Sequence, residues 1–180
     1  MDYDAFTIRQ LGGDVKVFRG IFAPMTSPVS IALQEINIPH LEFVHKGQVT
    51  SLEQAAAERG QTPGQVVRSI VFRIRAGEFV MVLMAGPAQI SWPALREYLG
   101  QKRVSMASDE EVLAATGYRI GTVSPIATAT RLRVLADRGV FIHEEISIGS
   151  GQPNTGIILK SADLRRALGN VEVGDFCSEK

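Results

Sequence analysis

The apolar residues recur with two different spacings that alternate along the chain. Helical spacing behind an N-cap residue predicts five short helices, at residues 28–38, 51–59, 92–99, 108–115 and 161–168. Their expected N-caps are Ser27, Thr50 or Ser51, Ser91, Ser108 and Ser161. Apolar and β-branched runs predict strands at residues 15–18, 41–45, 68–73, 78–85, 104–107, 132–135, 140–143, 146–148 and 157–159.

This alternation lacks a regular βαβ period, and no G-x-G-x-x-G opens a helix. We therefore expect an α+β fold with a mixed sheet and not a dinucleotide-binding fold. Residues 1–27 are interpreted as an N-terminal appendage whose Phe22 and Pro24 pack on the body, and residues 171–180 as a loose C-terminal tail.

Composition and charge are those of one globular domain. The 180 residues carry 19 Lys and Arg against 19 Asp and Glu, and 45% of them are apolar. Zero net charge argues against a strong non-specific nucleic-acid binder, so no DNA partner is expected. Arg131, Arg133 and Arg138 nevertheless allow a local basic face.

The sequence also predicts the compartment. It contains neither a signal peptide nor an apolar run of membrane length, so we expect a cytoplasmic protein without a membrane partner. Cys177 is the only cysteine, which excludes an internal disulfide and suits a reducing cytoplasm. The three histidines, His40, His45 and His143, have no acidic or cysteine partner at ligand spacing, so no metal and no cofactor are expected.

Two glycine-rich loops frame the second half of the chain. Residues 117–127 combine two glycines with a Ser-Pro pair, and residues 149–156 contain three more glycines. Glycine permits close backbone approach, so the first loop is interpreted either as a cradle for an anion or oxyanion or as a tight helix-to-strand connection.

Arg68 is the unusual residue of the strand predicted at 68–73. Its side chain points the same way as those of Ile70 and Phe72, and a permanent cation beside apolar neighbours needs a partner or a path to water. It is either a cation at the mouth of a pocket or an arginine that extends to solvent from the strand's start. A Ser124, His143, Glu144 triad is rejected because it requires free choice of residues.

An ordered series of segments resembles the YbaK and prolyl-tRNA-synthetase-associated editing domains. The segments are Ala55-Ala56, Val67 to Phe72, Gly117-Tyr118, Gly121 to Pro125, Gly149 to Gly151, Asn154-Thr155 and Ser161 to Leu164. The resemblance covers residues 28–170. It implies a mixed, partly rolled β-sheet surrounded by short helices, and a deacylase that hydrolyses the ester of a mischarged aminoacyl-tRNA.

The resemblance also implies roles for individual residues. Arg68, Gly121, Thr122 and Ser124 fall on candidate catalytic positions. Candidate substrate-binding positions are Ser69, Pro125, Gly149, Ser150, Gly151 and Asn154. The expected partners are the aminoacylated 3′ end of tRNA and, secondly, an aminoacyl-tRNA synthetase.

The chain departs from the family pattern at four residues. Arg68 replaces the pocket lysine, and Ala127 replaces a glycine that many relatives carry. Gln152 and Pro153 stand where several relatives have a histidine, while Asn154 and the threonine after it resemble the alanine-editing branch more than the cysteine-specific one.

Two functions follow from this pattern. The first is a trans-editing deacylase for a small amino acid such as Ala, Cys or Ser. The retained glycine loops favour it, because their backbone N–H groups can stabilise an oxyanion without an ionisable catalyst. The alternative is a non-catalytic relative that binds tRNA or a synthetase, which the loss of the lysine favours. Under either function, zero net charge predicts weak, salt-sensitive tRNA affinity.

Overall fold

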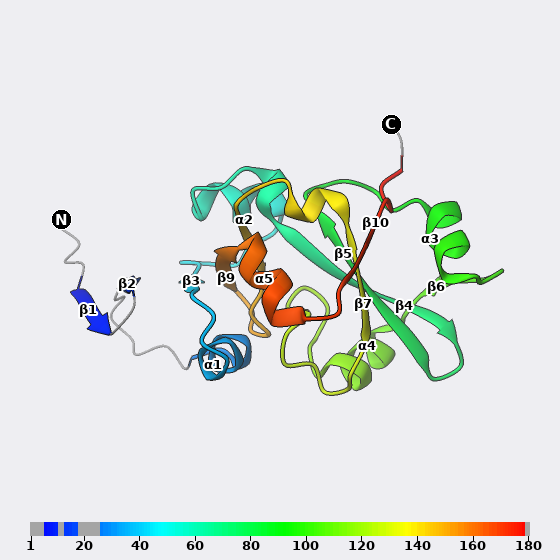
Figure 1. Ribbon diagram of the computed structural model, residues 1–180, viewed down its shortest axis with the longest axis horizontal. Coiled ribbons are helices and arrows are strands. Elements are labelled where there is room, and N and C mark those ends of the chain that lie inside the picture. Colours follow the sequence, from blue (N-terminus) through cyan, green and yellow to red (C-terminus); the bar gives the residue numbers. More distant parts are fainter. Residues whose placement is uncertain (1–5, 11–12, 18–25, 179–180) are drawn as a thin grey trace.

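The computed structural model describes residues 6–10, 13–17 and 26–178 (Figure 1). Within these residues the α-helices are α1 (Pro28–Glu35), α2 (Leu52–Glu58), α3 (Trp92–Leu99), α4 (Asp109–Thr116) and α5 (Ser161–Leu168), with 3₁₀ turns η1 (Pro63–Gln65) and η2 (Arg138–Phe141). The strands are β1 (Phe6–Gln10), β2 (Gly13–Val17), β3 (Leu41–Val44), β4 (Val67–Arg75), β5 (Glu78–Ala85), β6 (Ser105–Met106), β7 (Arg133–Asp137), β8 (Glu145–Gly149), β9 (Thr155–Lys160) and β10 (Glu172–Gly174).

Two sheets form the body. One has the order β10-β7-β5-β4-β6, in which β7 runs parallel to β5 and β10 and the other pairs are antiparallel. The other is the antiparallel sheet β3-β9-β8. A parallel bridge between Val66 and Ser147 joins the two at the start of β4. This arrangement confirms the predicted mixed α+β fold.

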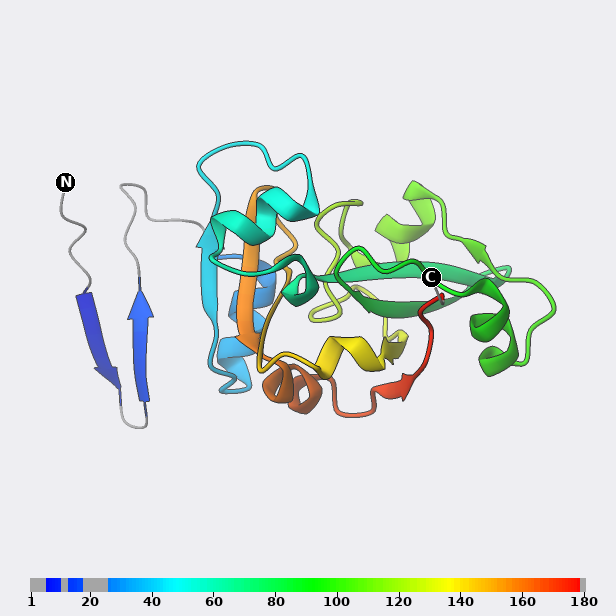
Figure 2. The ribbon, with the colours of Figure 1, turned by 90° about the horizontal axis from the view of Figure 1, so that it is seen from above.

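The central hairpin β4–β5 separates two apolar groups because successive side chains of a strand point to opposite faces. Val71, Met81 and Leu83 belong to the main core, which also takes residues from α1, α4, α5, β8 and β9. Phe72 and Val82 belong to a smaller group with residues of α3. Figure 2 accordingly shows α3 and α4 on opposite sides of the long β4–β5 pair.

Four of the predicted N-caps are confirmed. The side chains of Ser27, Ser51, Ser91 and Ser108 each accept a hydrogen bond from a backbone N–H in the first turn of their helix. The prediction for Ser161 is wrong. Helix α5 begins at Ser161 itself, and its N-cap position, Lys160, makes no side-chain cap.

Two further expectations are corrected. Residues 138–141 form the turn η2 and not a strand, because the Asp137 carboxylate accepts from the N–H of Gly139 at 2.8 Å and closes the turn. The loose tail is wrong for residues 172–178: β10 pairs with β7, and Phe176 is buried with its N–H donating to Asp137 at 2.8 Å.

The N-terminal prediction is met in part. The strand expected at residues 15–18 overlaps β2, which pairs with β1 in an antiparallel hairpin. Phe22 and Pro24 lie outside the described residues. In the described part of the chain, every helix is too short or too polar to cross a bilayer.

Candidate editing site

The two glycine-rich loops meet in the structure. A Cβ on Gly149 would lie 2.8 Å from the carbonyl oxygen of Thr122 and would also collide with the carbonyl of Val123. The N–H of Gly151 donates to the Thr122 carbonyl at 3.0 Å. The loop at 121–125 is therefore packed against the end of β8, and it is more than a tight connection between α4 and β7. Gly149 permits this backbone contact because it has no side chain.

The loop hydroxyls are used to shape the loops themselves. Thr122 Oγ1 donates to the Arg119 carbonyl at 2.9 Å, and Ser124 Oγ accepts from the Ile126 N–H at 3.3 Å. Ser150 Oγ accepts from the Gln152 N–H at 3.1 Å and also contacts backbone carbonyls. Because Thr122, Ser124 and Ser150 are buried and engaged, the groups of these loops suited to binding an oxyanion are backbone N–H groups.

Ala127 shows what the departure from glycine costs. Its φ is 54°, in the left-handed region, and the Tyr118 hydroxyl donates to its carbonyl at 2.9 Å. A glycine adopts this backbone without a steric penalty, whereas an alanine loses roughly 1 kcal/mol. Buried Pro125 and exposed Gly121, with φ 90°, complete the loop's shape.

The edge of β4 that faces away from β5 is open in its middle. Val66, just before the strand, bridges Ser147, and Phe72 and Arg73 pair with β6. The Val71 carbonyl accepts from the Ala107 N–H, just after β6, at 3.1 Å. Among the described residues no strand pairs with this edge between Val66 and Val71, and we call residues 68–70 the edge gap. The gap adjoins the glycine loops, because β8 runs parallel beside the start of β4 and ends at Gly149.

The edge gap carries Arg68 and Ser69 on opposite faces of β4. Arg68 lies opposite Met84 in the register and Ser69 opposite Leu83, and these two partners belong to different apolar groups. Ser69 Oγ is buried and has no hydrogen-bond partner among the described residues. A buried hydroxyl without a partner is unfavourable, so this group is available to a ligand.

Arg68 is held by the connection after β5. Its Nη2 donates to the carbonyl of Ala88, while Nε is buried and has no partner among the described residues. Burial lowers the pKa of the Arg68 guanidinium, but the group remains a cation at neutral pH. Arg68 donates to Ala88, and among the described residues it makes no hydrogen bond to either glycine loop.

Asn154 has a structural role at the far end of the second loop. Its Oδ1 accepts from the Val49 N–H at 3.3 Å, and its carbonyl accepts from the His45 N–H at 2.8 Å. Its φ of 54° is one that asparagine tolerates better than most residues. The predicted residues thus fall into three places: the joined glycine loops, the adjoining edge gap, and Asn154 beside the segment after β3.

The structure adds a buried polar cluster that the sequence did not predict. Arg59, at the end of α2, donates from Nε to His45 Nε2 at 3.2 Å and from Nη1 to Ser147 Oγ at 2.9 Å. His45 Nδ1 lies 2.6 Å from Glu58 Oε2. Ser147 is the residue that bridges to β4, so the cluster adjoins the edge gap.

These contacts determine the tautomer of His45. Since Arg59 can only donate, His45 Nε2 must accept, and its proton lies on Nδ1 and is donated to Glu58. The hydrogen bonds from His45 and then Gln54 hold the pKa of Glu58 below its usual value. Burial lowers the pKa of Arg59. Because its Nε2 is engaged, His45 is not free to serve as a general base.

A sequence signal for this cluster existed. Arg59 falls on the same helical face as Leu52, Ala55 and Ala56, so a cation is directed toward the body of the protein. The two hydrogen-bond partners of Arg59, His45 and Ser147, could not be predicted from sequence spacing, because both are distant from Arg59 in the chain.

The comparison with protein families identifies the chain. The model of the aminoacyl-tRNA editing domain matches residues 46–167. The chain belongs to the aminoacyl-tRNA editing domain family. The matched range includes both glycine loops, the edge gap and α2.

Relatives of this editing domain are parts of larger proteins. Proline--tRNA ligase of Thermosipho africanus is 34% identical over 143 residues, which are 76% of this chain and 25% of that protein. The ligase of Brachyspira hyodysenteriae is 26% identical over 141 residues, 78% of this chain and 24% of that protein. The chain therefore spans about a quarter of the length of these ligases.

Solved structures share the fold of the editing domain. A protein described as a candidate trans-editing enzyme for prolyl-tRNA synthetase matches with a TM-score of 0.77 and 24% identity, covering 84% of this chain and 95% of that one. A structure described only as a hypothetical protein matches with a TM-score of 0.74 and 23% identity, covering 81% and 96%. At 23% and 24% sequence identity, these two matches show a shared fold.

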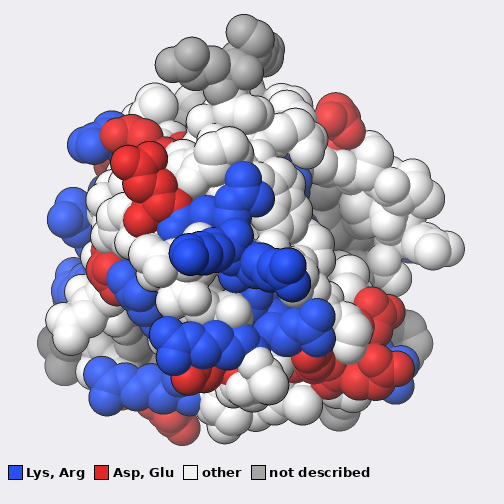
Figure 3. All heavy atoms as spheres, turned by 90° about the vertical axis from the view of Figure 1, so that its right-hand side faces the viewer, with Lys and Arg blue, Asp and Glu red and all other residues white. Residues whose placement is uncertain are grey.

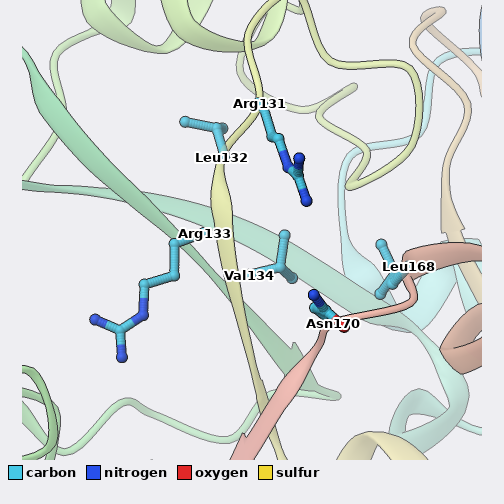
Figure 4. Close-up of a pocket in the computed structure, with 6 residues that line it drawn as sticks. All are labelled: Arg131, Leu132, Arg133, Val134, Leu168 and Asn170. Carbon is cyan, nitrogen blue, oxygen red and sulfur yellow. The ribbon is translucent and has the colours of Figure 1, made fainter.

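The surface also has two hollows, of which only the second touches a glycine loop. One, of about 350 Å³, is lined by Arg131, Leu132, Arg133, Val134, Leu168 and Asn170 (Figure 4). In Figure 4, Arg131 extends toward Leu168 and Asn170, whereas Arg133 points to the other side of β7. The second hollow, of about 320 Å³, shares Arg131 and is also lined by Pro125, which is the only predicted site residue at either hollow. The editing domain's candidate site is thus the loop contact and edge gap.

Proposed function

We propose that the protein is a trans-editing deacylase, which hydrolyses the ester of a tRNA mischarged with a small amino acid such as Ala, Cys or Ser. The observation that carries the proposal is the backbone contact between the loop at 121–125 and the end of β8 at Gly149, within a chain of the editing-domain family. That contact fixes a stretch of glycine-rich backbone beside the open edge of β4.

The chemistry uses fixed dipoles. Attack of water on the ester carbonyl gives a tetrahedral oxyanion, and collapse of that intermediate releases the amino acid and the ribose hydroxyl. Backbone N–H groups held in place before the reaction stabilise the oxyanion without reorganising. The family resemblance implies that an ordered water attacks with help from the substrate's own terminal ribose hydroxyl, which fits a site whose loop hydroxyls are already engaged.

Arg68 and Ser69 are proposed to bind the end of the substrate. The Arg68 guanidinium stays charged, so it cannot act as a base, but its planar set of donors suits a phosphate or a carbonyl oxygen. Within the part of the chain that the structure describes, neither its Nε nor the Ser69 hydroxyl has a hydrogen-bond partner. A terminal phosphate at Arg68 and the aminoacyl group near Ser69 would satisfy both groups.

A second function is favoured by one observation. Arg68 replaces the family lysine and donates to the Ala88 carbonyl, so part of its hydrogen-bonding capacity is committed to the protein. A non-catalytic module that binds tRNA or a synthetase would need only the donors of Arg68 that the Ala88 carbonyl does not engage. The two functions differ in turnover and share the tRNA end as ligand.

The test is release of amino acid from alanyl-, cysteinyl- and seryl-tRNA by the wild type, Arg68→Ala and the control Arg165→Ala, which alters an exposed arginine of α5. We expect turnover of one substrate, a severe loss in Arg68→Ala and no loss in the control. An absence of turnover across the panel with tRNA still bound would establish the binding module instead. Equal rates for all three proteins would remove Arg68 from the site.

A further inference from the structure

One end of the five-stranded sheet is strongly basic. Figure 3 shows Lys and Arg gathered across the face that lies on the right in Figure 1, where the β4–β5 hairpin, α3 and β6 are found. The exposed cations of the hairpin, of the loop between α3 and β6 and of the neighbouring start of β7 are Arg73, Arg75, Lys102, Arg103 and Arg133. We call these five residues the basic end.

The strand register places the basic end across both faces at one end of the sheet. Arg133 lies opposite Val80 of β5 and Val80 opposite Phe72, so Arg133 is on the α3 face, whereas the next residue, Arg73, is on the α4 face, where it pairs with Glu111. Arg73 lies opposite Ser105, the first residue of β6. Lys102 and Arg103 lie just before β6 in the chain and therefore beside β4 at this end of the sheet. Three strand spacings of about 4.8 Å give the basic end a width of about 14 Å.

Carboxylates form ion pairs with only some of these five cations. Arg73 pairs with Glu111 at 2.9 Å, Arg133 with Glu172 at 2.7 Å, and Arg75 more loosely with Glu78 at 3.8 Å. Among the described residues, Lys102 and Arg103 have no carboxylate within 4.0 Å, and both are exposed. Because the whole chain has zero net charge, this is a local excess and not a general property.

The surface beside the cations also suits nucleic acid. Arg133 lies over the ring of Tyr98, 5.9 Å from its centroid, and Tyr98 is 42% exposed. Met106 of β6 is 55% exposed. Cations interspersed with exposed aromatic and apolar side chains are typical of surfaces that bind RNA.

The basic end lies along the same strand as the edge gap. Arg73 is four residue steps along β4 from Ser69, which is about 13 Å of extended chain. At a rise of about 3.4 Å per nucleotide of a stacked strand, this distance corresponds to about four nucleotides. A substrate whose ester enters the edge gap would therefore place phosphates of its upstream nucleotides at the basic end.

We infer that the basic end binds the phosphate backbone of the tRNA next to its aminoacylated end. This inference rests on the proposed function and adds the surface that holds the RNA. The cations bind the backbone without reading its bases, so they contribute affinity to every tRNA and leave the choice of amino acid to the loops and the edge gap. A surface for an acidic protein partner is the competing explanation, and the test separates the two.

The test is the double variant Lys102→Glu/Arg103→Glu, which reverses the two unpaired charges. Its matched control is Arg165→Glu/Arg166→Glu, which reverses two exposed charges on α5. Binding of deacylated tRNA is measured for each protein at several salt concentrations. We expect the variant to bind roughly tenfold more weakly at about 0.1 M salt and its salt slope to fall by about two, and the control to match the wild type.

Hydrolysis rates on two substrates show whether the double variant impairs tRNA binding or the hydrolysis of the ester. The variant should lose kcat/KM on aminoacyl-tRNA by a similar factor and keep the wild-type rate on aminoacyl-adenosine, which carries the ester but no stem. Unchanged tRNA affinity in the variant, or an equal loss in the control, would overturn the inference and favour a protein partner. If the wild type hydrolyses neither ester, the proposed function fails while the binding measurement still decides the inference.

Discussion

The guanidinium of Arg59 lies against the backbone of Gly156, where an added Cβ would stand 2.5 Å from Cζ and 2.9 Å from Nε. Arg59 cannot move aside without losing its hydrogen bonds to His45 and Ser147. Glycine at 156 is thus the residue that makes room for the buried cation between α2 and the small sheet.

Gly156→Ala should therefore destabilise the fold. Overpacking against a fixed side chain costs about 1 to 3 kcal/mol. The control is Gly47→Ala, because no atom of the described residues lies within 4 Å of its added Cβ and its φ is not in the positive range. Chemical denaturation of both variants measures the difference, and equal stabilities would show that Arg59 is free to move.

The pH dependence of stability should reveal the His45 and Glu58 contact. Hydrogen bonds from His45 and Gln54 lower the pKa of Glu58 from 4.5, so the folded state favours the carboxylate. A depressed carboxyl pKa stabilises the fold above the unfolded-state pKa, and this stabilisation is lost as pH falls through the folded-state pKa. The stability difference between wild type and Glu58→Gln should thus be present at neutral pH and shrink below about pH 4. A difference that stays constant with pH would contradict this assignment.

Ala127 offers a substitution that should stabilise the protein. Replacement by glycine relieves the left-handed φ of 54°, with an expected gain of up to about 1 kcal/mol in the free energy of unfolding. The same change at Ala57, on the exposed face of α2, should cost about 1 kcal/mol, because glycine weakens a helix. Thermal unfolding distinguishes the signs, and destabilisation by both changes would show that the Ala127 backbone is not strained.

Ser69→Ala separates binding from folding. The hydroxyl is buried and no described residue is its hydrogen-bond partner, so its removal should leave stability unchanged or slightly increased. If the hydroxyl binds the aminoacyl end, KM for mischarged tRNA should rise several-fold. The comparison is Ser105→Ala on β6, which lies opposite Arg73 outside the edge gap. A loss of stability in Ser69→Ala together with normal kinetics would assign Ser69 to the core.

Local patterns in the sequence predicted much of the fold. The four serine N-caps and the apolar strands depend on neighbouring residues, and the structure confirms the caps and most of the strands, the strand expected at 140–143 being the exception. Ser161 was misplaced because the end of β9 continues directly into α5, so the cap position falls on Lys160. The burial of Phe176 could not be predicted, because its N–H bonds to Asp137, which is 39 residues away.

For the candidate site, too, the local features were predictable and the contacts between distant segments were not. The glycine content of both loops indicated shaped backbone, but nothing in the sequence shows that Gly149 packs against the carbonyls of Thr122 and Val123. The direction of Arg68 followed from strand alternation, and its partner, the Ala88 carbonyl, depends on the path of the chain after β5. Contacts between distant segments were the part that local patterns could not supply.

The contact at Gly149 is the basis of the proposed function, and one substitution tests it. In Gly149→Ala the added methyl must displace the backbone of Thr122 and Val123, while Gly47→Ala changes nothing nearby. The measurement is the rate of amino acid release from the mischarged tRNA that the wild type hydrolyses. We predict a loss of at least about tenfold in Gly149→Ala and none in Gly47→Ala, because a misplaced oxyanion donor costs about that much or more. Equal rates in the two variants would show that the joined glycine loops are not the site of hydrolysis.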